Sequence, residues 1–117
     1  TLALVISNTS DSKTYGVALF SDPYHNFNLT NSRGDEFRAT DVSGIDTAFD
    51  RGGTIYGSVS DLPPKSSITI SAKSQVRWNG RPGDYRPYRL QTVLIFGEEK
   101  QGRHPDLRKY NLVLDIK

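Results

Sequence analysis

The alternation of apolar and polar side chains in residues 110–117 constrains the fold more than any other feature. Apolar side chains occupy every second position, namely Tyr110, Leu112, Leu114 and Ile116. A period of two places successive side chains on opposite faces of a β-strand, whereas a helix repeats every 3.6 residues. The last residues of the chain are therefore predicted to form a half-buried strand.

The most apolar stretch, residues 89–96, is predicted to be a second strand. Its alternation is less clean, because Val93 and Ile95 place apolar side chains on the second face as well. A strand that is apolar on both faces is typical of the centre of a sheet with both faces covered. We expect this strand to pair antiparallel with residues 110–117, so that the two form the middle of a sheet.

Further strands are predicted where short apolar or alternating runs end at turn-forming residues. They are Leu2–Ile6, Tyr15–Phe20, a hairpin from Phe27 through Gly34 to Arg38, Thr54–Val59 with an interruption at Gly57, Ser66–Ala72, and a short strand Gln75–Trp78. Residues 39–53 are polar and lack a clear period. They read as a long connection with one helical turn around Ile45–Phe49.

These patterns give seven to nine short strands with turn signals roughly every 8–14 residues, and no amphipathic helix. The predicted fold class is all-β, as an immunoglobulin-like antiparallel β-sandwich, with a Greek-key β-barrel as the alternative. Residues 1–117 show no repeat and no linker, which indicates a single domain. Because the chain begins at Thr1, we expect it to be a mature or excised part of a longer protein.

Composition excludes several function classes. The chain has no cysteine, so disulfides, thiolate metal sites and cysteine catalysis are ruled out. No segment reaches the roughly 20 apolar residues of a membrane span, and no membrane insertion is expected. The net charge of +2 is unevenly distributed, since residues 73–117 contain ten Lys/Arg and five Asp/Glu. This basic half is either a surface for an anionic partner or ordinary surface charge.

Catalytic and metal-binding chemistry has few candidates. His104, with Asp106 nearby, would be the general base of a hydrolase. A solvated histidine in a loop is the alternative interpretation. We predict neither an enzyme nor a cofactor. Asp41, Asp46 and Asp50 would offer oxygen ligands to calcium, although their spacing does not match an EF-hand. Turn-forming and capping roles are the alternative for these aspartates.

The candidate binding site is the segment 73–89, in which arginines are interleaved with aromatic side chains. Its proposed binding residues are Arg77, Trp78, Arg81, Tyr85, Arg86, Tyr88 and Arg89. Arginine stacks on aromatic rings and donates a planar fork of hydrogen bonds. Three interpretations stay open: arginine stems that cover the aromatic rings, a protein interface, and a surface for single-stranded nucleic acid or acidic glycan.

Three segments resemble the telokin-like immunoglobulin domains of exported bacterial proteins and lipoproteins. They are Leu4–Ser10, which is similar to the opening strand of that family, Phe27–Phe37, which is similar to its hairpin, and Leu62–Ser66. The family usually has glycine where Lys65 stands here. The resemblance covers about half of the chain and implies an extracytoplasmic, non-catalytic β-sandwich used for adhesion, assembly or ligand contact. It brings no catalytic residues onto this sequence.

The leading hypothesis is therefore a non-catalytic binding or structural module of a secreted, periplasmic or cell-surface protein that acts through protein–protein contacts. The alternative is a β-barrel that binds an anionic polymer, either single-stranded nucleic acid or an acidic glycan. The first hypothesis predicts that Trp78→Ala or Arg86→Ala weakens partner binding without unfolding the domain. The second predicts an affinity that falls steeply with salt. The oligomeric state stays open.

Overall fold

The computed structural model describes residues 2–20, 26–74 and 87–116, and this part of the chain is built from ten β-strands. The strands are β1 (Leu2–Ser7), β2 (Tyr15–Phe20), β3 (Phe27–Thr30), β4 (Glu36–Ser43), β5 (Thr47–Arg51), β6 (Thr54–Gly57), β7 (Ser60–Leu62), β8 (Ser67–Ser74), β9 (Tyr88–Glu98) and β10 (Arg108–Ile116). The predicted all-β class is confirmed.

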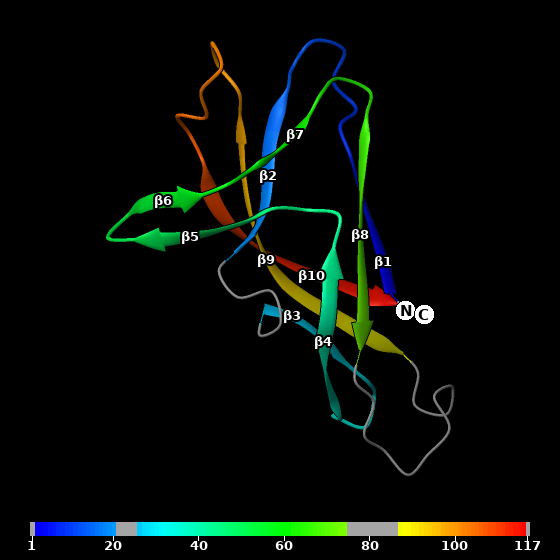
Figure 1. Ribbon diagram of the computed structural model, residues 1–117. Helices are drawn as coiled ribbons and strands as arrows, with labels where there is room; N and C mark the ends of the chain where they lie inside the picture. The colour runs from blue at the N-terminus through cyan, green and yellow to red at the C-terminus, as the bar shows by residue number, and fades with distance from the viewer. Residues whose placement is uncertain (1, 21–25, 75–86, 117) are drawn as a thin grey trace.

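The strands form two layers that face each other (Figure 1). The small sheet consists of β1, β8 and the second half of β4. In the large sheet, β10 pairs with β9, and the other side of β9 pairs with β3 along one half and β2 along the other. The first half of β4 pairs with β3, so β4 crosses from one sheet to the other. The sheets formed by the described strands do not close on themselves, so the fold is the predicted β-sandwich rather than the alternative barrel.

The main core lies between the two sheets and follows the predicted alternation. Ile70 and Ala72 of β8 are buried against Leu19, Phe27 and Leu90 of the large sheet. Apolar residues at every second position of β1 pack against this cluster. Burial of these side chains on both inner faces holds the sheets together, at roughly 1.5–3 kcal/mol for each large side chain.

Strand β9 is the central strand of the large sheet, as predicted. Leu90 is buried in the main core, whereas Ile95 belongs to a second cluster with Ala18 and Ala48 on the opposite face. That outer cluster lies under the β5–β6 hairpin, which extends to the left of the sandwich in Figure 1. The inner face of β9 is therefore covered at Leu90 and its outer face at Ile95, whereas Gln91 on the outer face is exposed.

Strand β10 pairs antiparallel with β9 over nine positions, from Arg108 opposite Phe96 to Ile116 opposite Tyr88. The expectation that it also lies in the middle of the sheet is wrong. Among the described residues β10 pairs with no strand other than β9, so it forms the edge of the large sheet.

Residues 39–53 differ most from the prediction. They form the end of β4 and the whole of β5 instead of a long connection with a helical turn. The described residues contain ten strands, whereas the sequence predicted between seven and nine. Strand β5 is parallel to β2, with Leu19 opposite Thr47, so the sandwich is not purely antiparallel. The predicted interruption at Gly57 is confirmed: a Cβ there would meet the Ala48 backbone at 2.9 Å, and the next strand, β7, begins only at Ser60.

Candidate functional site

The structure describes two of the seven predicted binding residues. Arg77, Trp78, Arg81, Tyr85 and Arg86 lie outside the described residues, as does the predicted strand Gln75–Trp78. Tyr88 and Arg89 begin β9, directly opposite Ile116 and Asp115 at the end of β10. The Arg89 Nε donates a hydrogen bond of 2.9 Å to the Asp115 carboxylate. The two described residues therefore adjoin the edge strand.

The edge strand β10 exposes an unusual amount of apolar surface. Tyr110 is 50% exposed, Val113 52% and Leu114 36%. Tyr110 and Leu114 alternate with the half-buried Leu112 and share its face, which is directed towards the small sheet. Within the part of the chain that the structure describes, the outer edge of this strand thus has no strand partner, and apolar side chains lie beside it.

An apolar groove opens beside this edge, between the two sheets. It has a volume of about 350 Å³ and is lined by Ile6, Val17, Leu94, Phe96 and Tyr110. Its aromatic wall is continuous, because the Phe96 ring stacks on Tyr15 at 4.8 Å and meets the edge of Tyr110 at 6.3 Å. We call this the edge groove. It lies between β1 and β10, each of which pairs with one neighbour among the described residues.

A second groove lies on the outer face of the large sheet, away from the main core. It has a volume of about 350 Å³ and its lining includes Asn26, Asn28, Gln91, Val93, Asn111 and Val113. Asn28 is directly opposite Gln91, which in turn is opposite Val113, and Asn111 is opposite Val93. Four carboxamide side chains therefore gather over β3, β9 and β10. We call this the amide groove.

Ion pairs stand at both ends of the amide groove. At one end is the Arg89–Asp115 pair, one alternation beyond Gln91. At the other end the Lys109 Nζ lies 3.1 Å from an Asp50 carboxylate oxygen and 5.0 Å from the centre of the Phe20 ring. The hydrogen bond from Lys109 lowers the pKa of Asp50, a second hydrogen bond from the Gly53 amide adds to this, and partial desolvation opposes it.

The comparisons with known proteins give no match. Neither a family model, nor a curated protein, nor a solved structure matches this chain. Within the part of the chain that the structure describes, no helix has both the length and the apolar character needed to span a membrane.

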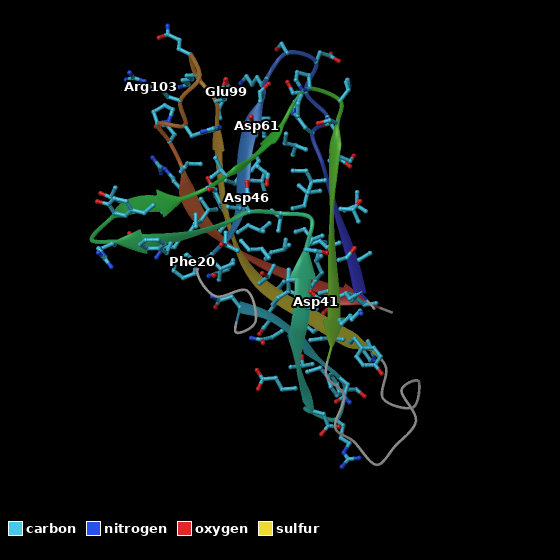
Figure 2. All side chains as sticks on the ribbon, viewed as in Figure 1. Phe20, Asp41, Asp46, Asp61, Glu99 and Arg103 are labelled. Carbon is cyan, nitrogen blue, oxygen red and sulfur yellow. The ribbon has the colours of Figure 1, made fainter. Side chains whose placement is uncertain are left out.

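The three aspartates considered for calcium do not gather in space. Asp41 belongs to β4 and Asp46 lies in the turn before β5 (Figure 2), whereas Asp50 on β5 contacts Lys109. Asp46 instead bridges strands through its backbone, which accepts a hydrogen bond from the Leu19 amide and donates one to the Ser60 hydroxyl. The described residues contain no group of three His, Asp or Glu side chains able to hold a metal ion.

His104 and Asp106 are directed to different partners. The His104 Nε2 lies 3.5 Å from the carboxylate of Asp61 on β7; Figure 2 labels Asp61. The imidazole ring of His104 covers Gly16 of β2. The Asp106 carboxylate accepts a hydrogen bond of 3.4 Å from Lys100. The described geometry therefore joins His104 to Asp61 and places it as a contact between the loop after β9 and strands β2 and β7.

The sequence interpretation missed the two grooves. The amides were visible as polar residues between core positions, as in Phe27-Asn28-Leu29 and Leu90-Gln91-Thr92. Only the register of the strands, however, shows that they meet on one face. The edge groove depends in the same way on the order of strands, which alternation within single strands does not encode.

Proposed function

We propose that this chain is a non-catalytic binding module that recognises a partner protein by adding an extended segment of the partner to the edge of β10. The observation that carries this proposal is the edge groove, which has Tyr110 in its wall and lies beside β10, a strand whose only partner among the described residues is β9. Edge strands offer main-chain hydrogen bonds to an added strand, and neighbouring pockets select its alternate side chains.

The sandwich is asymmetric in a way that favours this side. On one side β4 joins the two sheets, because its first half pairs with β3 and its second half with β8. On the other side, β1 and β10 are the last strands of their respective sheets among the described residues, and inner-face residues such as Tyr110 and Leu114 are exposed. An added strand would cover these side chains and satisfy the backbone groups of β10 in one step.

The resemblance to telokin-like domains supports a role in adhesion or assembly outside the cytoplasm. One local feature agrees with it: Lys65 has a φ of 58°, in the left-handed region that favours glycine, and glycine is what that family usually has at this position. We propose a secreted, periplasmic or cell-surface location on this basis. Tyr88 and Arg89 flank the end of β10 and are proposed as part of the contact.

The test compares two half-exposed tyrosines. Tyr110 belongs to the edge groove and Tyr56 to the β5–β6 hairpin, and each packs against a phenylalanine. We expect Tyr110→Ala to weaken binding to proteins captured from the source organism by roughly tenfold or more, as for an aromatic hot spot. Tyr56→Ala should leave the binding unchanged. Leu114→Lys, which places a charge on the same edge, should also prevent binding.

Amide hydrogen exchange in the captured complex locates the contact. Strand addition should slow exchange in β10, because its outward amides gain hydrogen bonds. Binding that survives Tyr110→Ala and Leu114→Lys, or protection that spares β10, would contradict the proposal. In that case Trp78→Ala and Arg86→Ala test the arginine and aromatic segment, because each is predicted to weaken partner binding without unfolding the domain. A salt titration with oligonucleotides and acidic glycans tests the anionic-polymer alternative.

A further inference from the structure

We propose that the amide groove on the outer face of the large sheet binds a neutral carbohydrate, with Gln91 and Asn111 as its main hydrogen-bonding residues. This site is separate from the edge groove, because the side chains of Asn111 and Val113 project to the face opposite Leu112 and Leu114. The inference therefore does not depend on the proposed protein contact.

The arrangement of carboxamides matches a ligand with many hydroxyl groups. Each carboxamide has one oxygen acceptor and two N–H donors, and each hydroxyl both donates and accepts. Asn28 and Gln91 are direct cross-strand neighbours, which places their Cβ atoms about 5 Å apart, and Asn111 is diagonal to Gln91 at about 7–8 Å. Neighbouring hydroxyls along a sugar chain can thus meet the exposed amides of Gln91 and Asn111 across β9 and β10, whereas the Asn28 Oδ1 is buried.

Part of this surface is already held in place. The Asn26 Nδ2 donates a hydrogen bond of 2.9 Å to the Phe20 carbonyl, which fixes this side chain at the margin of the groove. Asn28 is half-buried on β3, whereas Gln91 and Asn111 are exposed on the central and edge strands. A site with ordered margins loses less conformational entropy when a ligand binds.

The floor of the groove suits the other chemical side of a sugar. Val93 and Val113 lie between the amides, and Val113 is exposed. A pyranose ring has a face of C–H groups as well as an edge of hydroxyls, so it can cover the valines while its hydroxyls contact Gln91 and Asn111. Ligand sites generally combine an apolar surface with a few placed polar groups, and about 350 Å³ is at the small end of their volumes.

The charges around the groove favour a neutral ligand over an anionic one. The cations at its two ends are held in the ion pairs Arg89–Asp115 and Lys109–Asp50. An anionic polymer gains its affinity from cations that neutralise its charges, and both of these described cations, Arg89 and Lys109, already have a carboxylate beside them. The four amides carry no charge, so a neutral polyol loses nothing by electrostatic repulsion.

The test is a nuclear magnetic resonance titration of the whole chain with four neutral hexasaccharides, those of β-1,4-glucose, β-1,4-xylose, α-1,4-glucose and β-1,4-N-acetylglucosamine. We expect at least one to shift the side-chain amide signals of Gln91 and Asn111, with a Kd between about 10 μM and 1 mM. Gln91→Ala and Asn111→Ala should each weaken this binding about tenfold, which is about 1.4 kcal/mol. Gln91→Glu keeps the shape, removes both donors and should weaken it similarly.

The matched control is Gln101→Ala, which removes an exposed amide from the loop after β9. It should leave the affinity unchanged. The proposal is overturned if none of the four hexasaccharides binds at about 10 mM, or if binding is insensitive to Gln91→Ala and Asn111→Ala. It is also overturned if hexagalacturonate binds more tightly than every neutral hexasaccharide and loses affinity with salt, because the ligand would then be anionic.

Discussion

At the scale of single residues, Asn8 shows how one buried amide joins distant parts of the chain. Its Nδ2 lies within hydrogen-bonding distance of the carbonyls of Lys13, Leu62 and Pro63, at 2.7–3.0 Å, and its Oδ1 accepts from the Ser10 amide. A carboxamide carries two N–H donors and an oxygen acceptor, so the Asn8 donors are shared among the three carbonyls while its oxygen accepts from Ser10. The residue therefore connects the end of β1 to the end of β7.

We expect Asn8→Ala to lower the free energy of unfolding by about 2–3 kcal/mol, because carbonyls in and near the core lose their donor. Urea denaturation measures the change. Asn111→Ala, which removes an exposed amide, is the control and should change stability by less than about 0.5 kcal/mol. Equal effects of the two substitutions would show that the Asn8 network contributes little.

Two glycines with nearly the same backbone conformation give a second test. Gly34 has a φ of 91° and Gly44 a φ of 93°. A Cβ at Gly34 would meet nothing within 4 Å, whereas one at Gly44 would collide with the Thr69 carbonyl of β8. Gly34→Ala should cost about 1 kcal/mol from backbone strain alone. Gly44→Ala should cost at least about 2 kcal/mol more by overpacking, and similar costs in urea denaturation would refute the collision.

At the scale of elements, the strands that sequence alone predicts are those with unbroken alternation. Tyr15–Phe20 is found within the predicted bounds, and Ile68, Ile70 and Ala72 of β8 face the core as expected.

Strand β4 was predicted only to Arg38 because the alternation of its apolar and polar residues breaks after that position. Phe37 and Val42 are five positions apart, yet Phe37 is buried and Val42 packs on the core. The irregularity between Ala39 and Asp41 is the physical reason, since a bulge moves later side chains to the other face.

Strand β5 was missed for a different reason. Its inward side chains are Ala48 and Asp50, and its large apolar residue, Phe49, faces outward and stacks on Tyr56. The contact that holds it, between Asp50 and Lys109, joins residues far apart in the sequence. The candidate site shows the same limit. The sequence predicted Tyr88 and Arg89 as binding residues, and this stays a prediction, whereas the two grooves depend on strand register and order, which the sequence pattern does not give.

The Asp50–Lys109 pair predicts how stability depends on pH. The pKa of Asp50 is lowered in the folded state, chiefly by the hydrogen bond from Lys109, so the folded state binds fewer protons than the unfolded state. The ion pair therefore contributes its full stabilisation above the pKa that Asp50 has in the unfolded state, about 4. This stabilisation is lost as the pH falls through the lower pKa that Asp50 has in the folded state.

Removal of the cation should remove that dependence. We expect Lys109→Met to lower stability at pH about 6, by an amount that becomes smaller as the pH falls and Asp50 becomes protonated in the folded state. Urea denaturation across this range measures the difference. Lys100→Met, which disrupts the exposed pair with Asp106, controls for the loss of a surface charge. A difference that is constant with pH would contradict a role for Asp50 ionisation.

At the scale of the whole molecule, the sandwich has two cores of unequal size on the two faces of β9. The main core spans both sheets, whereas the outer cluster contains three buried residues under the β5–β6 hairpin. Two residue pairs join β5 to β2, and the hairpin exposes Phe49 and Tyr56. Regions with little buried apolar surface open at lower free energy than the global unfolding reaction. The hairpin is therefore expected to behave as a separate, weaker cooperative unit.

Native-state hydrogen exchange with two matched isoleucine variants tests this division. Ile55 packs on the outer cluster, and Ile55→Ala should raise exchange rates in β5 and β6 while leaving β8 and β9 close to their original protection. Ile70 is fully buried in the main core, and Ile70→Ala should lower the global free energy of unfolding by about 2–5 kcal/mol. It should raise exchange in the most protected amides of both sheets, because these exchange only when the whole sandwich unfolds. If both variants raised exchange uniformly, the two cores would form one cooperative unit, and the hairpin would be as firmly held as the sheets it covers.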